Sequence, residues 1–365
     1  MRGKRVMVSI SLCMIVKDEE AVLGRCLSGM KDLVDEIIIV DTGSEDRTRE
    51  IARQYTDRIY FFEWIDDFSA ARNFSFSKAS MDYCMWMDAD DVMSEKDREA
   101  FLELKRGLTL HTDVVMMRYH TAFDKNGNPT FWYYRERLIR NGCGYVWQGA
   151  VHEVITPSGN IVYSEVAVSH KKLGAGDPDR NLAIYKKMLS EGKVLNAREL
   201  YYYARELYYH ETYGEASKAL ESFLERQDAW VENKIEACQI MAKCYEKMGE
   251  GSASLQALFR SLEYDVPRAE ICCEIGRYFM EKEQYETAVF WYENALKCKL
   301  DLKKGGFVLP DCYQYIPSLQ LCVCCDKLGR YSEAEAYNEI AGQCKPESSA
   351  YLYNKEYFCR KKLLS

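Results

Sequence analysis

The chain changes its hydrophobic pattern once, near residue 173, and this change limits the folds open to it. Before that point, amphipathic stretches alternate with short apolar runs at residues 8–16, 36–40, 58–62, 83–87 and 114–120. Such runs are typical of a largely parallel sheet that helices cover. Beyond residue 173 the strand signals stop and helix formers dominate. The sequence therefore predicts an α/β domain over residues 1–175 and an all-α domain over residues 176–365.

A repeat of small residues runs through the second half. Its members occur in pairs twelve positions apart, and the pairs are Ala204 with Ala216, Ala242 with Ser254, Gly276 with Ala288, and Cys322 with Ala334. The two central pairs lie 34 residues apart, a period that resembles the tetratricopeptide repeat, in which small residues let two antiparallel helices pack closely. The last interval is longer, and residues 303–306 predict an inserted loop there.

Two prolines support this interpretation, because Pro267 and Pro346 fall near repeat ends, where a helix must stop. We therefore expect about four helical hairpins, with a generic helical bundle as the alternative. Stacked hairpins build a curved surface that binds a protein, a peptide or another copy of the chain. A homodimer through the repeat domain is one such arrangement.

Composition excludes several classes of protein. The chain has 365 residues, enough for two cores, and a net charge of −8 that argues against binding nucleic acid or anionic lipid. No apolar run approaches the roughly 20 residues that cross a bilayer, so we expect no transmembrane segment. Residues 1–16 resemble the start of a secretion signal, but no small-residue cleavage site follows, and a first buried strand is the favoured interpretation.

Cysteine usage indicates the compartment. The chain contains 15 cysteines but shows no convincing export signal, which favours a reducing cytosol and a cytoplasmic protein. Cys272 with Cys273, and Cys322 with its neighbours Cys324 and Cys325, lack a second ligand pair at zinc spacing. These cysteines are predicted to pack in a core.

Three carboxylates follow the apolar run at 83–87, namely Asp88, Asp90 and Asp91. Crowded carboxylates repel one another at a strand end, which predicts a divalent cation between them. An Asp-rich turn that caps the next helix at Ser94 is the alternative. In parallel sheets, ligands collect at the carboxyl ends of strands, and the residues after the first two runs are also acidic.

Four motifs in order make a resemblance specific: residues 9–20 (SISLCMIVKDEE), 38–48 (IIVDTGSEDRT), 68–73 (FSAARN) and 87–91 (MDADD). With them the first half resembles glycosyltransferase family 2, whose GT-A fold is a Rossmann-like mixed sheet that binds nucleotide-diphospho-sugars. Together with the tetratricopeptide-like repeats, the chain is similar to a bacterial subgroup that includes peptide glycosyltransferases. The resemblance implies Mg²⁺ or Mn²⁺ and a nucleoside-diphosphate sugar, with UDP as the expected nucleotide.

The resemblance also implies residues that bind the nucleoside. Asp41 would accept a hydrogen bond from a base imino group, or alternatively cap the helix that begins near Asp46. Ile15 and Val16 would form an apolar wall against the base. Glu19 would lie near the ribose, where the preceding residue departs from the family, which commonly has Asn-Glu at this point.

Further residues would hold the phosphates and the metal. Arg72 and Asn73 would contact a phosphate or the base, with a surface ion pair as the alternative for Arg72. Arg137, on a basic strand, would contact the diphosphate or an acidic acceptor unless that strand is a solvated edge. The expected metal site comprises Asp90 as the direct ligand, Asp88 near the ribose or a metal-bound water, and Asp91 in support. His170 would be a further ligand of the metal or the diphosphate, with a structural histidine as the alternative.

The family segment that matches residues 146–153 commonly ends in His-Glu, which implies a general base. We expect Glu153 in that role, with His152 as the competitor. Successive side chains of a strand face opposite ways, so only one of the two is expected to face the acceptor. Attack on the anomeric carbon opposite the leaving group would invert its configuration.

The sequence thus predicts a metal-dependent inverting hexosyltransferase. Its acceptor is expected to be a peptide or protein side chain, or else a surface-glycan or lipid intermediate. A non-catalytic repeat scaffold that binds a nucleotide is the alternative from a different class. A nucleotidyltransferase would need a Gly-rich basic phosphate loop near the first strand, which the sequence lacks.

Overall fold

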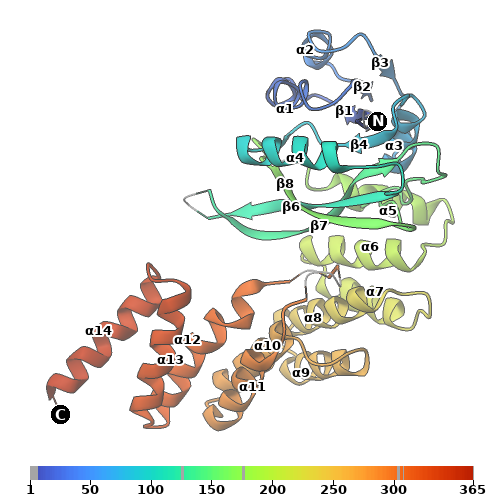
Figure 1. Ribbon diagram of the computed structural model, residues 1–365. Coiled ribbons are helices and arrows are strands. Elements are labelled where there is room, and N and C mark those ends of the chain that lie inside the picture. Colours follow the sequence, from blue (N-terminus) through green and yellow to red (C-terminus); the bar gives the residue numbers. More distant parts are fainter. Residues whose placement is uncertain (1–6, 125–126, 175–176, 302–304, 307, 365) are drawn as a thin grey trace. The chain divides into compact units, whose positions relative to one another are not determined.

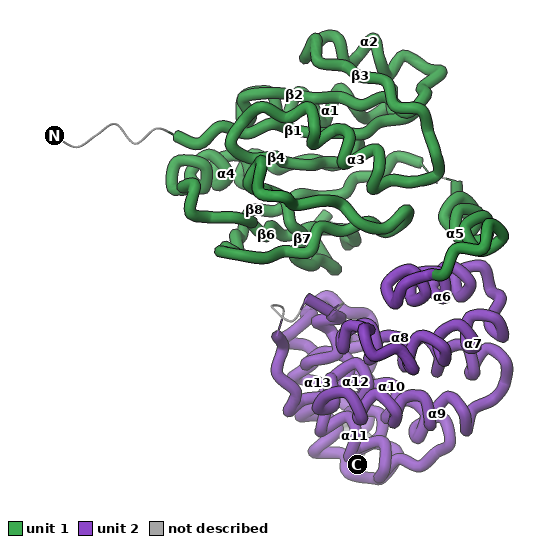
Figure 2. The backbone as a smooth tube through the Cα atoms, turned by 90° about the vertical axis from the view of Figure 1, so that its right-hand side faces the viewer, with its two compact units in different colours: residues 1–194 green, residues 195–365 purple. Residues whose placement is uncertain are grey.

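The computed structural model describes residues 7–124, 127–174, 177–301, 305–306 and 308–364. It divides into two compact units, residues 1–194 and 195–365, which Figure 2 colours separately. The boundary proposed from the sequence, at 175/176, lies outside the described residues. Helix α5 (Arg180–Ser190) groups with the first unit, although its composition resembles that of the repeats.

The first unit is built on an eight-stranded sheet in the order β3-β2-β1-β4-β7-β6-β8-β5 (Figure 1). The strands are β1 (Ile10–Val16), β2 (Glu36–Asp41), β3 (Ile59–Phe61), β4 (Tyr83–Trp86), β5 (Asp91–Val92), β6 (Val114–Phe123), β7 (Pro129–Arg140) and β8 (Ile161–His170). The first four are parallel, whereas β7 is antiparallel to β4 and to β6. The sheet is therefore mixed, as the GT-A resemblance implies, and less parallel than the apolar runs alone suggest.

Helices cover both faces of this sheet. They are α1 (Leu23–Met30), α2 (Thr48–Ala52), α3 (Phe68–Phe76) and α4 (Glu95–Gly107). Leu23 of α1 and Phe101 of α4 belong to the main core cluster on one face. On the other face, Phe74 and Phe76 of α3 pack against a smaller cluster that contains Cys13. Residues 10–16 form a buried strand, which confirms that interpretation of the N-terminal apolar run.

The pairing register of the strands explains where a site can form. Val16 pairs with Asp41, and Cys13 pairs with Trp86, so β1, β2 and β4 end at the same edge of the sheet. The short strand β5 then pairs antiparallel with β8, which places Asp91 opposite His170. Sequence positions that are far apart thus meet at this edge.

The second unit consists of helical hairpins followed by a last helix. Its helices are α6 (Ala197–Tyr209), α7 (Tyr213–Leu224), α8 (Val231–Lys247), α9 (Gly251–Arg260), α10 (Ala269–Glu281), α11 (Tyr285–Lys297), α12 (Tyr315–Lys327), α13 (Tyr331–Cys344) and α14 (Ser349–Leu364), with 3₁₀ turns at Ser261–Glu263 and Pro310–Tyr313. Every small-residue pair predicted from the sequence falls on the two helices of one hairpin, and all eight residues are buried. The repeat is confirmed.

Other sequence predictions on this unit have mixed outcomes. Pro267 and Pro346 lie between helices, as predicted. Lys303 and Lys304 of the expected inserted loop lie outside the described residues. The five cysteines of the two clusters are buried in one apolar core, and all 15 cysteines are free thiols. Among the described residues, no helix has both the length and the apolar character that a membrane span requires.

Gly276→Ala is expected to lower the stability of the repeat domain by about 1–2 kcal/mol. A Cβ at this position would lie 2.9 Å from the ring of Tyr292, which is itself buried, so the ring has little room to move. The steric penalty outweighs the gain in helix propensity, which is at most about 1 kcal/mol. Thermal unfolding followed by circular dichroism measures the shift.

Gly251→Ala is the matched control, because a Cβ there would meet only Tyr278 at an ordinary 3.7 Å. It should leave the midpoint unchanged or raise it. Equal midpoints for the two variants would contradict the packing argument for Gly276.

Candidate functional site

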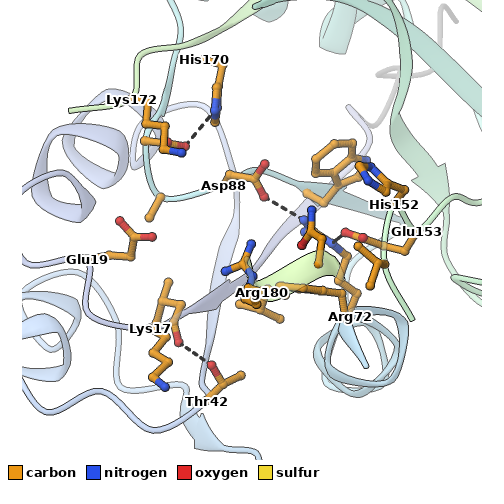
Figure 3. Close-up of a pocket in the computed structure, with 18 of the residues that line it drawn as sticks. Lys17, Glu19, Thr42, Arg72, Asp88, His152, Glu153, His170, Lys172 and Arg180 are labelled. Atoms are coloured by element: carbon orange, nitrogen blue, oxygen red, sulfur yellow. Dashed lines mark hydrogen bonds and ion pairs between the residues drawn. The ribbon is translucent and has the colours of Figure 1, made fainter. Parts of the chain in front are cut away.

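A pocket of about 420 Å³ opens at the sheet edge where β1 and β4 end (Figure 3). Its walls come from β1, α3, the turn after β4, residues 151–153, the end of β8 and the start of α5. Of the residues expected at the site, those that line the pocket are Ile15, Val16, Glu19, Arg72, Asp88, Asp90, His152, Glu153 and His170. Asp41, Asn73, Asp91 and Arg137 do not line it.

A group of three side chains could hold a metal ion. Ligand atoms of Asp88, Asp91 and His170 all lie within 4.8 Å of one another. Two carboxylates and an imidazole suit Mn²⁺ or a similar divalent cation, so the donor set fits the expected metal. Asp90, expected to be the direct ligand, lies outside this group, but its Oδ1 is 3.1 Å from Nδ1 of His170. The alternative role in helix capping is wrong, since Ser94 caps α4 through its own hydroxyl.

Asp91 is the fully buried member of this group, and several neighbours hold its carboxylate in place. Its carboxylate is fully buried and accepts hydrogen bonds from the backbone N–H of Asp88, at 3.1 Å, and from the hydroxyl of Tyr119, at 3.0 Å. Nη1 of Arg137 lies 3.1 Å from its Oδ2. Arg137 is itself fully buried, with its guanidinium 3.7 Å from the centre of the Trp86 ring. The expectation that Arg137 contacts a diphosphate is therefore wrong: it pairs with Asp91 beneath the pocket.

The pKa values of several side chains in and around this group are shifted far from their ordinary values. Hydrogen bonds to Asp90 and Asp91 raise the pKa of His170 to about 10. Burial raises the pKa of Glu19 to about 7, and the negative charges of Asp90 and Asp88 add to the rise. Burial also opposes ionisation of Asp88, but the guanidinium of Arg72 outweighs it and lowers the pKa to about 2. Titratable groups shifted in opposite directions within one pocket are typical of a functional site.

Arg72 joins the two chemical parts of the pocket. Its Nη2 lies 2.8 Å from Oδ1 of Asp88, and its Nε lies 2.5 Å from Oε1 of Glu153. The guanidinium sits near the rings of Trp86 and Trp147, at 4.9 and 5.0 Å from their centres. It is 6% exposed, so the surface ion pair considered from the sequence is wrong. Arg72 is a buried bridge between the acidic group and the candidate base.

His152 and Glu153 both line the pocket, so the expectation that only one would face it is wrong. The physical reason is that residues 151–153 form no strand. They lie in a loop closed by a single bridge between Gln148 and Val154, and His152 has a φ of 53°. Strand alternation does not apply in such a backbone.

Asn73 has a structural role in place of the expected ligand contact. Its side chain donates to the carbonyl of Trp147 at 2.9 Å and accepts from the N–H of the same residue at 2.8 Å. This pair of hydrogen bonds fixes the start of the loop that carries Glu153. The prediction that Asn73 contacts the nucleotide is therefore wrong.

Asp41 lies behind Thr42, which is the residue of this turn that lines the pocket. Its Oδ1 accepts from the backbone N–H groups of Gly43 and Ser44, both at 2.7 Å. Its Oδ2 is buried and accepts no hydrogen bond from any described residue, although Nε of Arg49 lies 3.5 Å away. One acceptor atom of Asp41 is thus left over at the end of β2.

The pocket also contains residues that the sequence did not indicate. Trp64 and Phe68 contribute two aromatic rings, and Lys17, Lys172 and Arg180 contribute three cations. Phe68 and Lys17 belong to two of the motifs, although neither was given a role, and Arg180 was assigned to the repeat domain. No local pattern marks the others, because they meet through the tertiary fold.

Comparisons with known proteins locate a family in the first unit. The model of glycosyl transferase family 2 matches residues 11–148. A TPR repeat-containing protein of Synechococcus elongatus is 47% identical over 153 residues, which cover 42% of this chain and 36% of that protein. The lipopolysaccharide core biosynthesis glycosyltransferase LpsC of Rhizobium meliloti is 30% identical over 163 residues, covering 42% of this chain and 58% of LpsC. The matches thus span less than two thirds of either relative.

Solved structures resemble parts of the chain only distantly. The crystal structure of MamA has a TM-score of 0.37 and 18% identity, covering 51% of this chain and 92% of MamA. The crystal structure of TarS from S. aureus has a TM-score of 0.38 and 13% identity, covering 67% of this chain and 55% of TarS.

Proposed function

The chain carries a glycosyl transferase family 2 domain followed by tetratricopeptide-like repeats, and from this premise we propose that it is a metal-dependent inverting glycosyltransferase. The donor is a nucleoside-diphosphate sugar, with UDP-hexose as the proposed form. One observation carries the proposal most. Arg72 holds a candidate metal ligand and a candidate general base, Asp88 and Glu153, on two sides of one pocket.

Asp88, Asp91 and His170 would hold the metal ion, with Asp90 beside them. When bound, Mg²⁺ or Mn²⁺ supplies positive charge that stabilises the departing nucleoside diphosphate. Lys172 follows His170 by two residues and lines the same part of the pocket, where its ammonium suits the phosphates.

The nucleoside would bind beside Ile15, Val16 and Glu19, which line the pocket at the end of β1. Oδ2 of Asp41, which accepts no hydrogen bond from a described residue but lies 3.5 Å from Nε of Arg49, is the proposed acceptor for the base N–H. Because that atom is covered, a small movement of the turn at residues 42–44 is part of this proposal.

Glu153 is the proposed general base. It is close to Arg72, which keeps its carboxylate oriented within the pocket. A carboxylate that takes the proton from an acceptor hydroxyl raises the nucleophilicity of that oxygen as it attacks the anomeric carbon. Attack from the face opposite the nucleoside diphosphate gives inversion.

The acceptor is proposed as a hydroxyl of a carbohydrate or of a peptide or protein side chain. The name of LpsC, a lipopolysaccharide core enzyme, favours carbohydrate. Fifteen free thiols support a reducing, cytoplasmic location. Association of two copies through the repeats remains a prediction that light scattering can test.

Chelation of metal is expected to lower the release of UDP from UDP-sugars by about tenfold or more, because the negative phosphates then face Asp88 and Asp90 uncompensated. The full-length protein is incubated with UDP-glucose, UDP-galactose and UDP-N-acetylglucosamine, with and without EDTA. Added Mn²⁺ should restore the rate. Asp88→Asn should lose it in the presence of Mn²⁺, and the exposed Asp57→Asn should retain it.

Two results would count against this function. An unchanged rate in EDTA, together with a fully active Asp88→Asn protein, contradicts the metal role. UDP binding by calorimetry without turnover of any sugar nucleotide would favour the non-catalytic scaffold.

A further inference from the structure

The same pocket has a further part of its wall at the start of α5, which contributes none of the candidate metal ligands. Trp64, Phe68 and Arg180 line it together. The rings of Trp64 and Phe68 are 4.7 Å apart at 65°, and the guanidinium of Arg180 lies 4.8 Å from the centre of the Phe68 ring. In Figure 3 the Arg180 side chain points into the pocket. An aromatic pair and a cation thus share one wall.

Arg180 differs from most arginines of this chain in its partners. Among the described residues it forms no hydrogen bond or ion pair, and its guanidinium packs over the ring of Phe68. By contrast, Arg72, Arg135 and Arg137 around the same pocket are each paired with a carboxylate. The charge of Arg180 is therefore available to a ligand.

This region adjoins the candidate base. Phe68 and Arg72 lie four residues apart on α3, so their side chains share a helix face about 5–6 Å apart. Arg72 contacts Glu153, and the backbone N–H of Phe68 donates to the carbonyl of Ala150 at 2.9 Å. Phe68 and Glu153 thus line the same pocket on elements that contact each other, so the Phe68 ring is a candidate surface for a molecule that gives its proton to Glu153.

The wall is held in place by α5. Nζ of Lys187 lies 2.5 Å from Oδ2 of Asp66, and the other carboxylate oxygen of Asp66 accepts from Nε1 of Trp64 at 2.9 Å. The segment that carries both rings is therefore tied to the helix that carries Arg180. This contact brings the cation and the aromatic surface to the same side of the pocket.

We propose that Trp64, Phe68 and Arg180 form the acceptor subsite and that the acceptor is an anionic sugar, one that carries a phosphate or a carboxylate. The C–H face of a sugar ring packs on an aromatic ring, and a guanidinium pairs with either anion. Lys172, two residues after the candidate ligand His170, is the cation proposed above for the donor diphosphate. The proposal rests on the proposed function, because it assigns the acceptor half of the same pocket.

The test uses the full-length protein with Mn²⁺ and the UDP-sugar that it hydrolyses. Glucose, glucose 6-phosphate and glucuronate are added as acceptors, and UDP release is measured. The KM for the better of the two anionic sugars should be about tenfold or more below that for glucose. Whichever anion gives the lower KM distinguishes phosphate from carboxylate.

Arg180→Gln should raise the KM for that anionic sugar by about tenfold and leave the KM for glucose and the affinity for UDP unchanged. Arg53→Gln, an exposed charge on another part of the first unit, is the matched control and should change none of them. Calorimetric titration of glucose 6-phosphate or glucuronate into the UDP-loaded protein gives a second readout that needs no turnover.

Three results would overturn the proposal while the glycosyltransferase function stands. One is equal KM values for glucose and both anions, or no acceleration by any of these sugars. Another is a loss of UDP affinity in Arg180→Gln, which would assign Arg180 to the diphosphate. The third is acceleration by a serine-containing peptide and by none of the sugars. Absence of metal-dependent UDP release altogether would instead refute the proposed function.

Discussion

Glu153→Gln is expected to lower the rate of sugar transfer by about 100- to 10,000-fold, while UDP affinity changes by less than about twofold. The amide cannot take a proton from the acceptor, yet it has nearly the same shape and can still accept a hydrogen bond from Nε of Arg72. The pocket should therefore keep its structure. Initial rates with the acceptor found above, and calorimetry with UDP, separate catalysis from binding.

His152→Ala supplies the comparison that decides the assignment. Its side chain lines the same pocket, and its backbone has a φ of 53° that alanine adopts with some strain. We expect it to keep more than about a tenth of the rate, since it leaves the base in place. Glu63→Gln, an exposed carboxylate outside the pocket, controls for loss of charge. An active Glu153→Gln protein beside an inactive His152→Ala protein would make His152 the base.

Arg72 gives this assignment a wider consequence. It contacts Asp88 and Glu153 at once, and it is enclosed by two tryptophan rings. Any change in the position of Asp88 therefore reaches Glu153 through one rigid group. The acidic group and the base form one connected unit, and single substitutions in it should not be additive.

Much of this architecture could be predicted from the sequence. The apolar runs gave the first strands because a strand buried on both faces reads as a continuous apolar segment. The small residues at twelve-residue spacing predicted the hairpins because a small residue lets the two helices of a hairpin pack closely, as Gly276 of α10 does against Tyr292 of α11. The family resemblance, drawn from four ordered motifs, is confirmed by the family match over residues 11–148.

Whether a side chain on a strand lines the pocket or is buried in the core could not be predicted in the same way. Arg135 and Arg137 lie two apart on β7, so alternation gives them the same face. Arg135 lines the pocket, whereas Arg137 is fully buried one step further along. Only the pairing of β7 with β4 and β6 determines where the pocket ends, and this pairing is antiparallel and includes register shifts.

Contacts between distant segments were also beyond the sequence. His170 reaches the Asp88 group because β5 pairs with β8, across 79 positions for Asp91 and His170. Arg180 reaches the pocket because α5 packs in the first unit, although its helical composition matches that of the repeats. The amino-acid composition of a segment indicates whether it forms a helix or a strand, but it does not indicate which other segments it packs against.

Arg137→Met is expected to lower the free energy of unfolding of the first unit by about 3–5 kcal/mol. Arg137 and Asp91 are both fully buried, and methionine would leave the carboxylate without its guanidinium partner, with the His170 imidazole, 3.3 Å away, as the remaining cationic group beside it. Methionine can fill much of the space beside Trp86 and Tyr119, so loss of packing explains only a small part of the effect. Urea unfolding in EDTA, followed by tryptophan fluorescence, measures the change.

Arg140→Met is the matched control on the same strand. Its side chain is 37% exposed and lies 3.5 Å from Asp113, and such a surface pair is worth about 0–1 kcal/mol. Adding Asp91→Asn to Arg137→Met should recover about 1 kcal/mol or more, because the unpaired charge is then gone. If Arg137→Met and Arg140→Met lowered stability equally, the buried pair would not be what holds Asp91 beneath the pocket. If the double variant recovered nothing, the loss would come from packing against Trp86, and Asp91 would have to be held by Tyr119, His170 and the backbone of Asp88.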